Sequence, residues 1–335
     1  MMRRSLILAE RPKGQPGRDT FALRDDPIPE PGPGEVVTRT IWLSIDPYMR
    51  GRLSGAKSYA APVEVGQPMT GETVGEVTAS ADPALAVGDI VVGPRGWQSH
   101  IVSKAKHVTK LERGAAPLSA YLGVLGMPGT TAYSGMQDIG RPKSGETVVI
   151  SAASGAVGSV AGQLAKRAGC RVVGVAGGPD KCLWVQETLG FDACVDHRLP
   201  HLGRLLAEEC PNGIDVYFEN VGGVVQEAVF PLLATFGRMV MCGMVAQYSD
   251  SELRPGPNLG ACVAKRLHIE GLIVSDKPER FAEWRNLASP WVRDGSLKYR
   301  ETIIEGLENA PEALRLVLTG GNFGKMLVRV GPDAA

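Results

Sequence analysis

Val148-Val149-Ile150-Ser151-Ala152-Ala153-Ser154-Gly155-Ala156-Val157-Gly158 is the stretch of sequence that decides the fold of the central part of the chain. Its apolar start is typical of a short buried strand, and a helical pattern follows over Val157–Ala168. The turn between them has the AxxGxxG form of the dinucleotide fingerprint, with Ala153 in place of the first glycine. Gly155 would let the backbone approach a pyrophosphate, and Gly158 would let the helix pack on the strand. Because a helix N-terminus also attracts phosphate, the stretch predicts a dinucleotide site rather than a plain tight turn.

Strands and helices alternate after this stretch. The helix is followed by a strand-like run at Arg171–Ala176 and by a second helical pattern at Asp180–Leu189. Four more strand-like runs come later, at Ala193–Asp196, Ile214–Glu219, Arg238–Gly243 and His268–Val274. This alternation implies a parallel sheet covered on both faces. Six such strands with a glycine turn after the first predict a doubly wound Rossmann domain.

The first ~120 residues have a different character, because short β-branched runs such as Val36–Ile45 and Thr73–Thr78 are separated by turns rich in Pro and Gly. Proline at this density does not suit helix interiors or central strands, so the pattern predicts a barrel or sandwich. From about Tyr299 the pattern changes back to short strands around one helix. The predicted fold class is therefore α/β: a β-rich domain together with a doubly wound parallel sheet.

The composition excludes several classes of protein. Lys and Arg total 36 and so do Asp and Glu, and this zero net charge argues against a nucleic-acid binder. The apolar run near the N-terminus is shorter than the core of a signal peptide. Two uncharged stretches, 114–137 and 147–165, are interrupted by Gly, Pro or Ser, so no membrane span is expected. Six cysteines with no CxxC pair predict free thiols, and the cytoplasm is the expected compartment.

The second strand of the Rossmann pattern bears on which nucleotide would bind. An NAD enzyme would place Asp or Glu at the tip of this strand to bind the ribose hydroxyls. Here the tip reads Ala176-Gly177-Gly178-Pro179-Asp180-Lys181. Glycine would leave room for a 2′-phosphate and Lys181 would supply a positive charge, so NADP(H) is favoured. The alternative is that Lys181 is a solvated lysine at a helix start.

Metal and hydrolytic chemistry lack their usual motifs. The five histidines form no HExxH and no Cys–His cluster, so a zinc site is not expected. Neither a GxSxG elbow nor a phosphate-binding P-loop is present. The remaining polar candidates stand where strands end, in Glu219–Gly223 and Cys242–Tyr248. On position alone, Tyr248 could have either a structural or a functional role.

Several motifs together resemble one family. They are Leu43–Gly51, Gly126–Tyr133, Ala152–Gly158, Gly190–Asp192, Glu219–Gly223, Gly271–Val274, Glu308–Pro311 and Gly321–Lys325. In this order and spacing the chain is similar, nearly end to end, to the zinc-free branch of the medium-chain dehydrogenases/reductases. Within that branch it resembles the prostaglandin reductase, 2-alkenal (double-bond) reductase and curcumin reductase family.

The resemblance implies a GroES-like catalytic domain split by an inserted Rossmann domain. Its parts would be residues 1–125 of the catalytic domain, the NADP-binding domain 126–298, and a return to the catalytic domain in 299–335. The family reaction is the NADPH-dependent reduction of the carbon–carbon double bond of α,β-unsaturated aldehydes and ketones. The resemblance also implies a homodimer, with edge strands near Arg238–Gly243 and His268–Val274 as candidates for pairing.

The resemblance also implies roles for individual residues. The pyrophosphate would lie on Gly155, Ala156, Val157 and Gly158, and the 2′-phosphate on Lys181. The rest of the cofactor would be lined by Asn220, Cys242, Gly243, Met244, Tyr248, Ile273, Val274, Ser275 and Asn322. This chain has His197 where many relatives have a tyrosine near the adenosine phosphate, and a histidine can still stack or donate a hydrogen bond.

Without a metal, the enolate that forms when hydride adds to the β-carbon needs hydrogen-bond donors. Tyr248 is the candidate catalytic residue, as a donor to the enolate oxygen or as the acid that protonates the α-carbon, and Tyr48 is a candidate for the substrate site. Two other functions stay open. One is NADPH-dependent quinone reduction by the same apparatus, and the other is NADPH binding without catalysis.

Overall fold

The computed structural model describes residues 2–94, 96–250, 252 and 254–333 of the chain. The chain divides into two compact units, one made of Met1–Gly123 with Glu301–Ala335 and the other of Val124–Arg300. Within the described residues no helix is long and apolar enough to cross a membrane.

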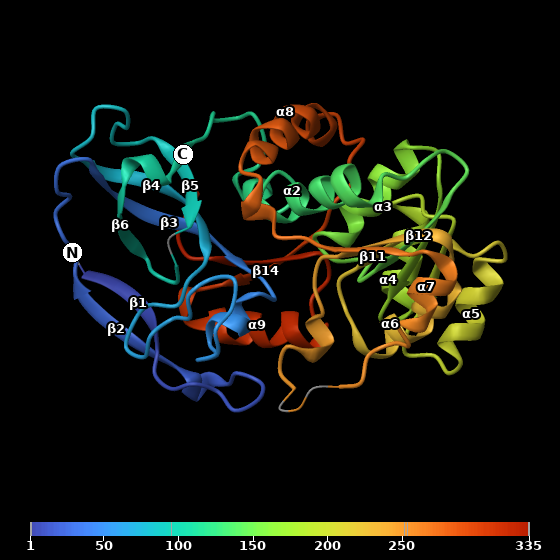
Figure 1. The fold of residues 1–335 in the computed structure, drawn as a ribbon. Helices are drawn as coiled ribbons and strands as arrows, with labels where there is room; N and C mark the ends of the chain where they lie inside the picture. The colour runs from blue at the N-terminus through green and yellow to red at the C-terminus, as the bar shows by residue number, and fades with distance from the viewer. Residues whose placement is uncertain (1, 95, 251, 253, 334–335) are drawn as a thin grey trace. The chain divides into compact units, whose positions relative to one another are not determined.

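The second unit is built on a six-stranded parallel sheet in the order β10-β9-β8-β11-β12-β13. Figure 1 labels β11 and β12 of this sheet, with α4, α5, α6 and α7 among the helices of the unit. This order, with the first strand in the middle, is that of a Rossmann fold, so the fold predicted from the sequence is confirmed. The strands are β8 (Thr147–Ser151), β9 (Arg171–Ala176), β10 (Ala193–Asp196), β11 (Ile214–Glu219), β12 (Leu233–Met241) and β13 (His268–Gly271).

Helices cover both faces of this sheet. Alternate strand residues point to opposite sides, and apolar residues are buried on each side. On one face Tyr217 and Met239 pack in a core with Leu206 of α5 and Val225 of α6. On the other face a Cβ built on Gly135 would lie 2.6 Å from the Phe218 ring, so the helical segment after α2 lies directly against the sheet. The helices of the unit are α2 (Met127–Ser134), α3 (Gly158–Arg167), α4 (Pro179–Glu187), α5 (Leu202–Glu209), α6 (Gly223–Val229), α7 (Gly260–Lys265) and α8 (Glu279–Arg293).

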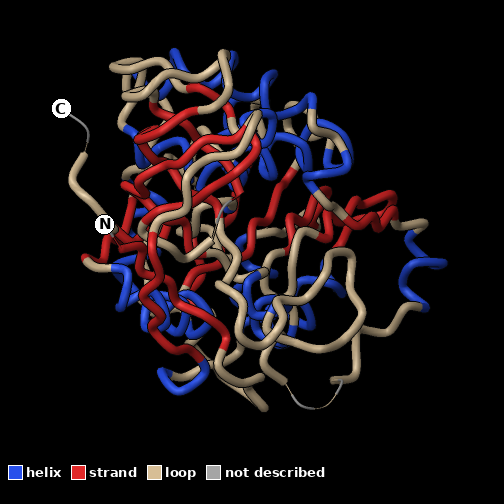
Figure 2. The backbone as a smooth tube through the Cα atoms, turned by 90° about the vertical axis from the view of Figure 1, so that its left-hand side faces the viewer, coloured by secondary structure: helices blue, strands red, loops and turns tan. Residues whose placement is uncertain are grey.

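The first unit is built mainly of strands and loops (Figure 2). Its larger sheet has the order β14-β15-β3-β4-β5-β7, with β6 paired to β3, and a separate hairpin joins β1 to β2. The strands are β1 (Met2–Leu8), β2 (Phe21–Pro27), β3 (Glu35–Ile45), β4 (Glu72–Ser80), β5 (Ile90–Pro94), β6 (His100–Lys104), β7 (Thr109–Lys110), β14 (Glu301–Glu305) and β15 (Lys325–Arg329), and the helices are α1 (Met49–Arg52) and α9 (Ala310–Thr319).

A buried ion pair ties the C-terminal tail into this unit. The Lys325 ammonium donates to the carbonyl of Ile45 at 2.9 Å and pairs with Asp46, and the two charged side chains are only 4% and 6% exposed. The Ser44 hydroxyl also donates to Asp46. Removing one member would leave a buried charge unpaired, which is costly, so β15 is held firmly beside β3.

Two details differ from the sequence expectation. β12 lies between β11 and β13 and is not an edge strand, so the pairing role expected near Arg238–Gly243 is wrong for that strand. β13 ends at Gly271, earlier than expected, and Val274–Asp276 forms a 3-10 turn instead. The domain limits 1–125, 126–298 and 299–335 stay a prediction.

Candidate active site at the strand ends

The turn between β8 and α3 is shaped by its backbone. Ala152 has a positive φ of 47°, and its carbonyl accepts a hydrogen bond from the amide of Gly155 at 2.8 Å. A Cβ built on Gly158 would lie 2.3 Å from the same carbonyl oxygen, so no side chain fits there without a shift of the backbone. Gly155, Ala156 and Val157 remain partly exposed in front of the helix. This arrangement suits a pyrophosphate at the start of α3.

A buried carboxylate connects this turn to the next strand. Glu219, at the end of β11, is fully buried, and its Oε1 lies 2.9 Å from the Ser151 hydroxyl and 2.7 Å from the amide of Val221. The Ser151 hydroxyl in turn accepts from the amide of Asn220, whose side-chain amide donates to the Ser151 carbonyl at 2.8 Å. Neither Ser151 nor Glu219 was predicted from the sequence as an individual site residue. Together they fix the orientation of Asn220.

The loop after β12 is hydrogen-bonded to the same segment at the end of β11. The amides of Cys242 and Gly243 donate to the Glu219 carbonyl at 2.9 and 3.1 Å. The amide of Val245 donates to the Asn220 carbonyl at 3.2 Å, and the amide of Ala246 donates to the Val221 carbonyl at 2.9 Å. Four backbone hydrogen bonds therefore hold the Cys242–Tyr248 segment against the end of β11.

Tyr248 follows a 3-10 turn in this loop and is half-buried. Its hydroxyl oxygen accepts a hydrogen bond from the amide of Met244 at 3.2 Å. A Cβ built on Gly243 would lie 2.9 Å from that oxygen, so glycine at this position makes space for the phenol. The contact helps to set where the hydroxyl lies.

Cys242 stays a neutral thiol. Burial, with a contribution from the Glu219 carboxylate, raises the pKa of Cys242 to about 12. Since the thiolate is the nucleophilic form, this cysteine is unreactive at neutral pH. It follows β12 as a small, largely apolar group.

The remaining predicted residues of this unit lie at the neighbouring strand ends. Ile273, Val274 and Ser275 follow β13, where the amide of Leu272 donates to the Met241 carbonyl at 3.0 Å and keeps the segment beside β12. Lys181 lies in the first turn of α4, after β9, and His197 follows β10. Burial lowers the pKa of both side chains. Arg198, to which the sequence analysis gave no role, lies beside them.

Two predicted residues belong to the first unit. Tyr48 is the N-cap residue of α1, and the Arg52 guanidinium lies over its ring. Burial raises the pKa of its phenol well above the usual range, with Asp46 and Glu72 adding to the shift. The Asn322 side-chain amide donates to the carbonyl of Gly324 at 2.8 Å.

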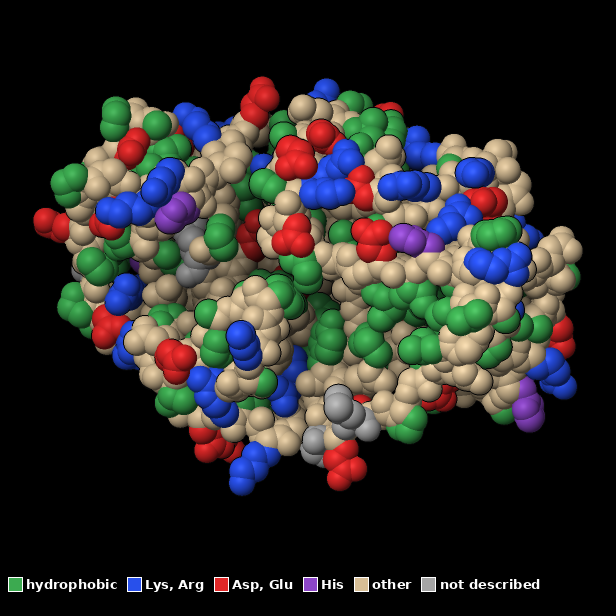
Figure 3. All heavy atoms as spheres, in the orientation of Figure 1, with side chains coloured by type: hydrophobic (Ala, Val, Ile, Leu, Met, Phe, Trp, Pro, Cys, Tyr) green, Lys and Arg blue, Asp and Glu red, His purple; other side chains and the backbone are tan. Residues whose placement is uncertain are grey.

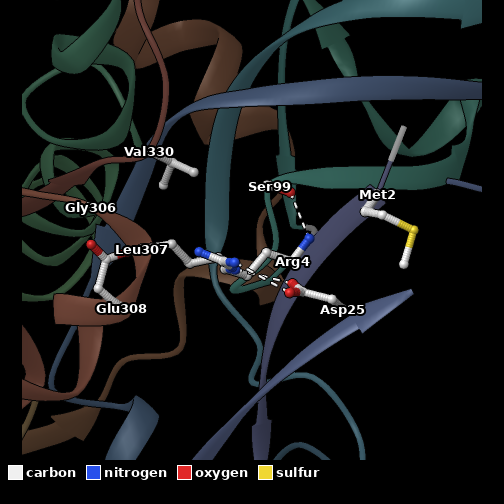
Figure 4. Close-up of a pocket in the computed structure, with 8 residues that line it drawn as sticks. All are labelled: Met2, Arg4, Asp25, Ser99, Gly306, Leu307, Glu308 and Val330. Carbon is white, nitrogen blue, oxygen red and sulfur yellow. Dashed lines mark hydrogen bonds and ion pairs between the residues drawn. The ribbon is translucent and has the colours of Figure 1, made fainter. Parts of the chain in front are cut away.

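The first unit also contains a cavity of about 280 Å³ (Figure 4). Its arginine, Arg4, is paired with Asp25 at 3.0 and 3.2 Å, and the Arg4 amide donates to the Ser99 hydroxyl (Figure 4). None of the residues that line it was predicted as a site residue. We assign no function to this cavity.

Metal-binding groups are not assembled in the described part of the chain. No cluster of three or more His, Cys, Asp or Glu side chains there could hold a metal ion. The described donor set therefore does not fit a zinc centre of the usual three or four protein ligands.

Comparisons with known proteins cover nearly the whole chain. Residues 4–111 match a family described as the N-terminal domain of oxidoreductase, and residues 156–292 match one described as zinc-binding dehydrogenase. The chain is 46% identical to the NADPH-dependent curcumin reductase of Escherichia coli, with 98% of this chain and 97% of the relative covered. It is 40% identical to the NADP(+)-dependent 2-alkenal reductase of Nicotiana tabacum, covering 91% and 90%. The solved structure of CurA from Vibrio vulnificus in complex with NADPH superposes with a TM-score of 0.94 at 45% identity, covering 98% of this chain and 100% of that chain.

Proposed function

Because the chain belongs to the medium-chain dehydrogenase/reductase family, we propose that it uses NADPH to reduce the carbon–carbon double bond of α,β-unsaturated aldehydes and ketones. The comparisons confirm the family resemblance that the sequence motifs indicated. The proposal rests mainly on the loop that follows β12. Backbone hydrogen bonds hold this loop against the end of β11, and it carries Tyr248 at the same end of the parallel sheet as the AxxGxxG turn.

The residues at the strand ends fit the cofactor. The Gly155–Gly158 turn would hold the pyrophosphate, since its backbone is accessible and a helix starts behind it. Lys181 and His197 would face the 2′-phosphate, while Asn220, the Cys242–Met244 segment and Ile273–Ser275 would line the nicotinamide half. When bound, NADPH supplies the hydride that adds to the β-carbon of the substrate.

The chain's own task is then to stabilise the charge that develops on the carbonyl oxygen. The Tyr248 hydroxyl is fixed by the Met244 amide and can donate its proton to this oxygen or to the α-carbon. A donor that is already oriented loses little energy to reorganisation as the charge develops. No step is assigned to zinc, because the described side chains offer no suitable ligand group.

A homodimer is part of the proposal. Among the described strands, β13 ends the sheet and pairs on one side only, and its four residues are all exposed. Hydrophobic side chains gather over α6 and α7 (Figure 3). In and next to these helices, Val224, Leu259 and Val263 are 61%, 64% and 81% exposed. Unpaired strand edges and exposed apolar surface are both features of association sites.

The proposed activity is tested by an NADPH-oxidation screen over 2-alkenals, enones and quinones, with the saturated carbonyl product identified by mass spectrometry. We expect turnover of alkenals and enones to exceed that of quinones. Preferential turnover of quinones would overturn the proposed substrate class, and binding of NADPH without turnover of any acceptor would indicate a non-catalytic protein.

A further inference from the structure

Two basic side chains converge on the glycines that follow β9. A Cβ built on Gly177 would lie 2.8 Å from His197 Nε2 and 3.3 Å from Arg198 Nε. A Cβ built on Gly178 would lie 3.0 Å from an Arg198 guanidinium nitrogen, so this side chain extends across both glycines. Larger residues at either glycine would displace the arginine or the histidine.

The charges around this point are mostly positive. Gly178 is the N-cap of α4, where the helix carries positive potential, and Lys181 stands in the first turn. Burial lowers the pKa of both Lys181 and His197, and the Arg198 charge lowers each further; for His197 the Asp196 charge opposes the shift. Such crowding of like charges is unfavourable unless an anion binds among them.

The neighbouring carboxylate of Asp196 interacts with the Arg198 charge at longer range, and its hydrogen bonds go to backbone amides. Asp196 Oδ1 accepts from the backbone amides of Gly178 at 2.9 Å and of Arg198 at 3.0 Å. Among the described residues, none of the ion pairs within 4.0 Å includes the Arg198 guanidinium. The guanidinium is therefore held near the glycines with its charge available to a ligand.

We propose that Arg198 binds the 2′-phosphate of NADPH and is the residue that sets the preference for NADPH over NADH. A planar guanidinium can form two parallel hydrogen bonds to a phosphate, which a lysine ammonium cannot do. NADH has a neutral hydroxyl in place of the phosphate, so it gains nothing from this charge. The inference rests on the proposed function, of which it specifies the cofactor selectivity.

The test measures binding to the full chain by calorimetry, with 2′,5′-ADP as the probe that carries the phosphate and 5′-AMP as the probe that lacks it. In Arg198→Gln we expect the affinity for 2′,5′-ADP to fall about tenfold to a hundredfold, as for the loss of a charge-assisted contact, while 5′-AMP changes by less than about twofold. Arg204→Gln is the matched control, because Arg204 lies on α5, is 70% exposed and pairs with Glu208. Its affinities should equal those of the wild type.

Equal losses for the two probes, or an unchanged affinity for 2′,5′-ADP, would overturn the role of Arg198. Arg198→Lys gives a second measure. It keeps the positive charge but lacks the two parallel donors of the guanidinium, so it should bind 2′,5′-ADP with intermediate affinity. The pKa of His197, followed by NMR in the ligand-free protein, should rise in Arg198→Gln because a nearby positive charge is lost. A wild type that prefers 2′,5′-ADP but reduces no enone would contradict the proposed reaction and leave the role of Arg198 intact.

Discussion

At the scale of single residues, the Tyr248 hydroxyl accepts a hydrogen bond from the Met244 amide at 3.2 Å. The loop that carries this oxygen is held by backbone hydrogen bonds to Glu219 and to the two residues after it. Oriented donors are the chief means of stabilising charge in a transition state. The arrangement therefore favours a direct role of Tyr248 in the reaction.

Tyr248→Phe keeps the ring but removes the hydroxyl. We expect kcat on a 2-alkenal to fall by roughly 10²-fold, the scale of one lost acid or oxyanion donor, with little change in the affinity for NADPH. Steady-state kinetics and a fluorescence titration measure the two quantities. Tyr133→Phe is the control, since the Tyr133 ring packs on Trp284 with centroids 5.4 Å apart and would keep that contact. An unchanged kcat on a chemistry-limited substrate would remove Tyr248 from the mechanism.

Motifs predict some of these residues and not others. The glycines of the β8–α3 turn and Lys181 stand at fixed distances from a strand, so their positions follow from local spacing. Arg198 reaches Gly177 and Gly178 only because β10 pairs with β9, a contact between distant segments. Glu219 and Ser151 meet in the same way through the pairing of β11 with β8. Side-chain contacts that depend on strand pairing have no signature in a single sequence.

At the scale of elements, the β8–α3 turn depends on the absence of a side chain at Gly158. The carbonyl of Ala152 occupies the space that a Cβ would need, and it is already bonded to the amide of Gly155. The helix can therefore start close to the strand, which places its N-terminus at the sheet edge. Both the stability of the turn and the binding of a pyrophosphate depend on this close approach.

Gly158→Ala should lower the free energy of unfolding by about 1–3 kcal/mol, as overpacking in a well-packed interior does, and weaken NADPH binding as well. Gly203→Ala is the control, because a Cβ on this residue of α5 would meet nothing within 4 Å. That substitution should leave stability unchanged or raise it by up to about 1 kcal/mol. Chemical denaturation with a cofactor titration measures both effects, and equal stability of the two variants would contradict the steric argument.

The elements themselves are mostly readable from the sequence. The apolar runs of β9, β10 and β11 coincide with the observed strands, since buried parallel strands are continuously apolar. β12 starts at Leu233, five residues before the predicted run, and its first part includes the exposed Phe236 with positive φ. The hairpin of β1 and β2 alternates polar and apolar residues too irregularly for its pattern to indicate strands.

At the scale of the whole molecule, the absence of a metal-ligand cluster among the described residues has a direct consequence. Activity should survive exhaustive chelation, because the carbonyl oxygen would be stabilised by hydrogen-bond donors instead. Elemental analysis of the purified protein should find less than one zinc per chain. Stoichiometric zinc whose removal abolishes activity would contradict the metal-independent mechanism.

The association of two chains concerns the exposed edge at β13. Parallel pairing with β12 uses one side of the β13 backbone, and Ile269 in its centre is 37% exposed. A lysine there would place a charge at an edge that dimerisation would bury, and charged side chains are a known means of blocking edge pairing. Ile269→Lys should therefore shift the protein from dimer to monomer, with a dissociation constant raised at least about tenfold, the effect of roughly 1.4 kcal/mol.

Sedimentation measured over a range of protein concentrations detects this shift. Leu183→Lys serves as the control, because Leu183 is 55% exposed and lies far from β13. It is part of α4, which packs beside β10, and β10 and β13 are at opposite edges of the sheet. The control should remain dimeric with the wild-type dissociation constant. If the wild type sediments as a monomer at micromolar concentration, or if both variants dissociate equally, β13 is not the association edge. The exposed strand would then have to be protected from edge pairing in another way, for example by the polar side chains of His268 and Glu270, whose Nε2 and Oε2 atoms lie 2.9 Å apart on the same strand.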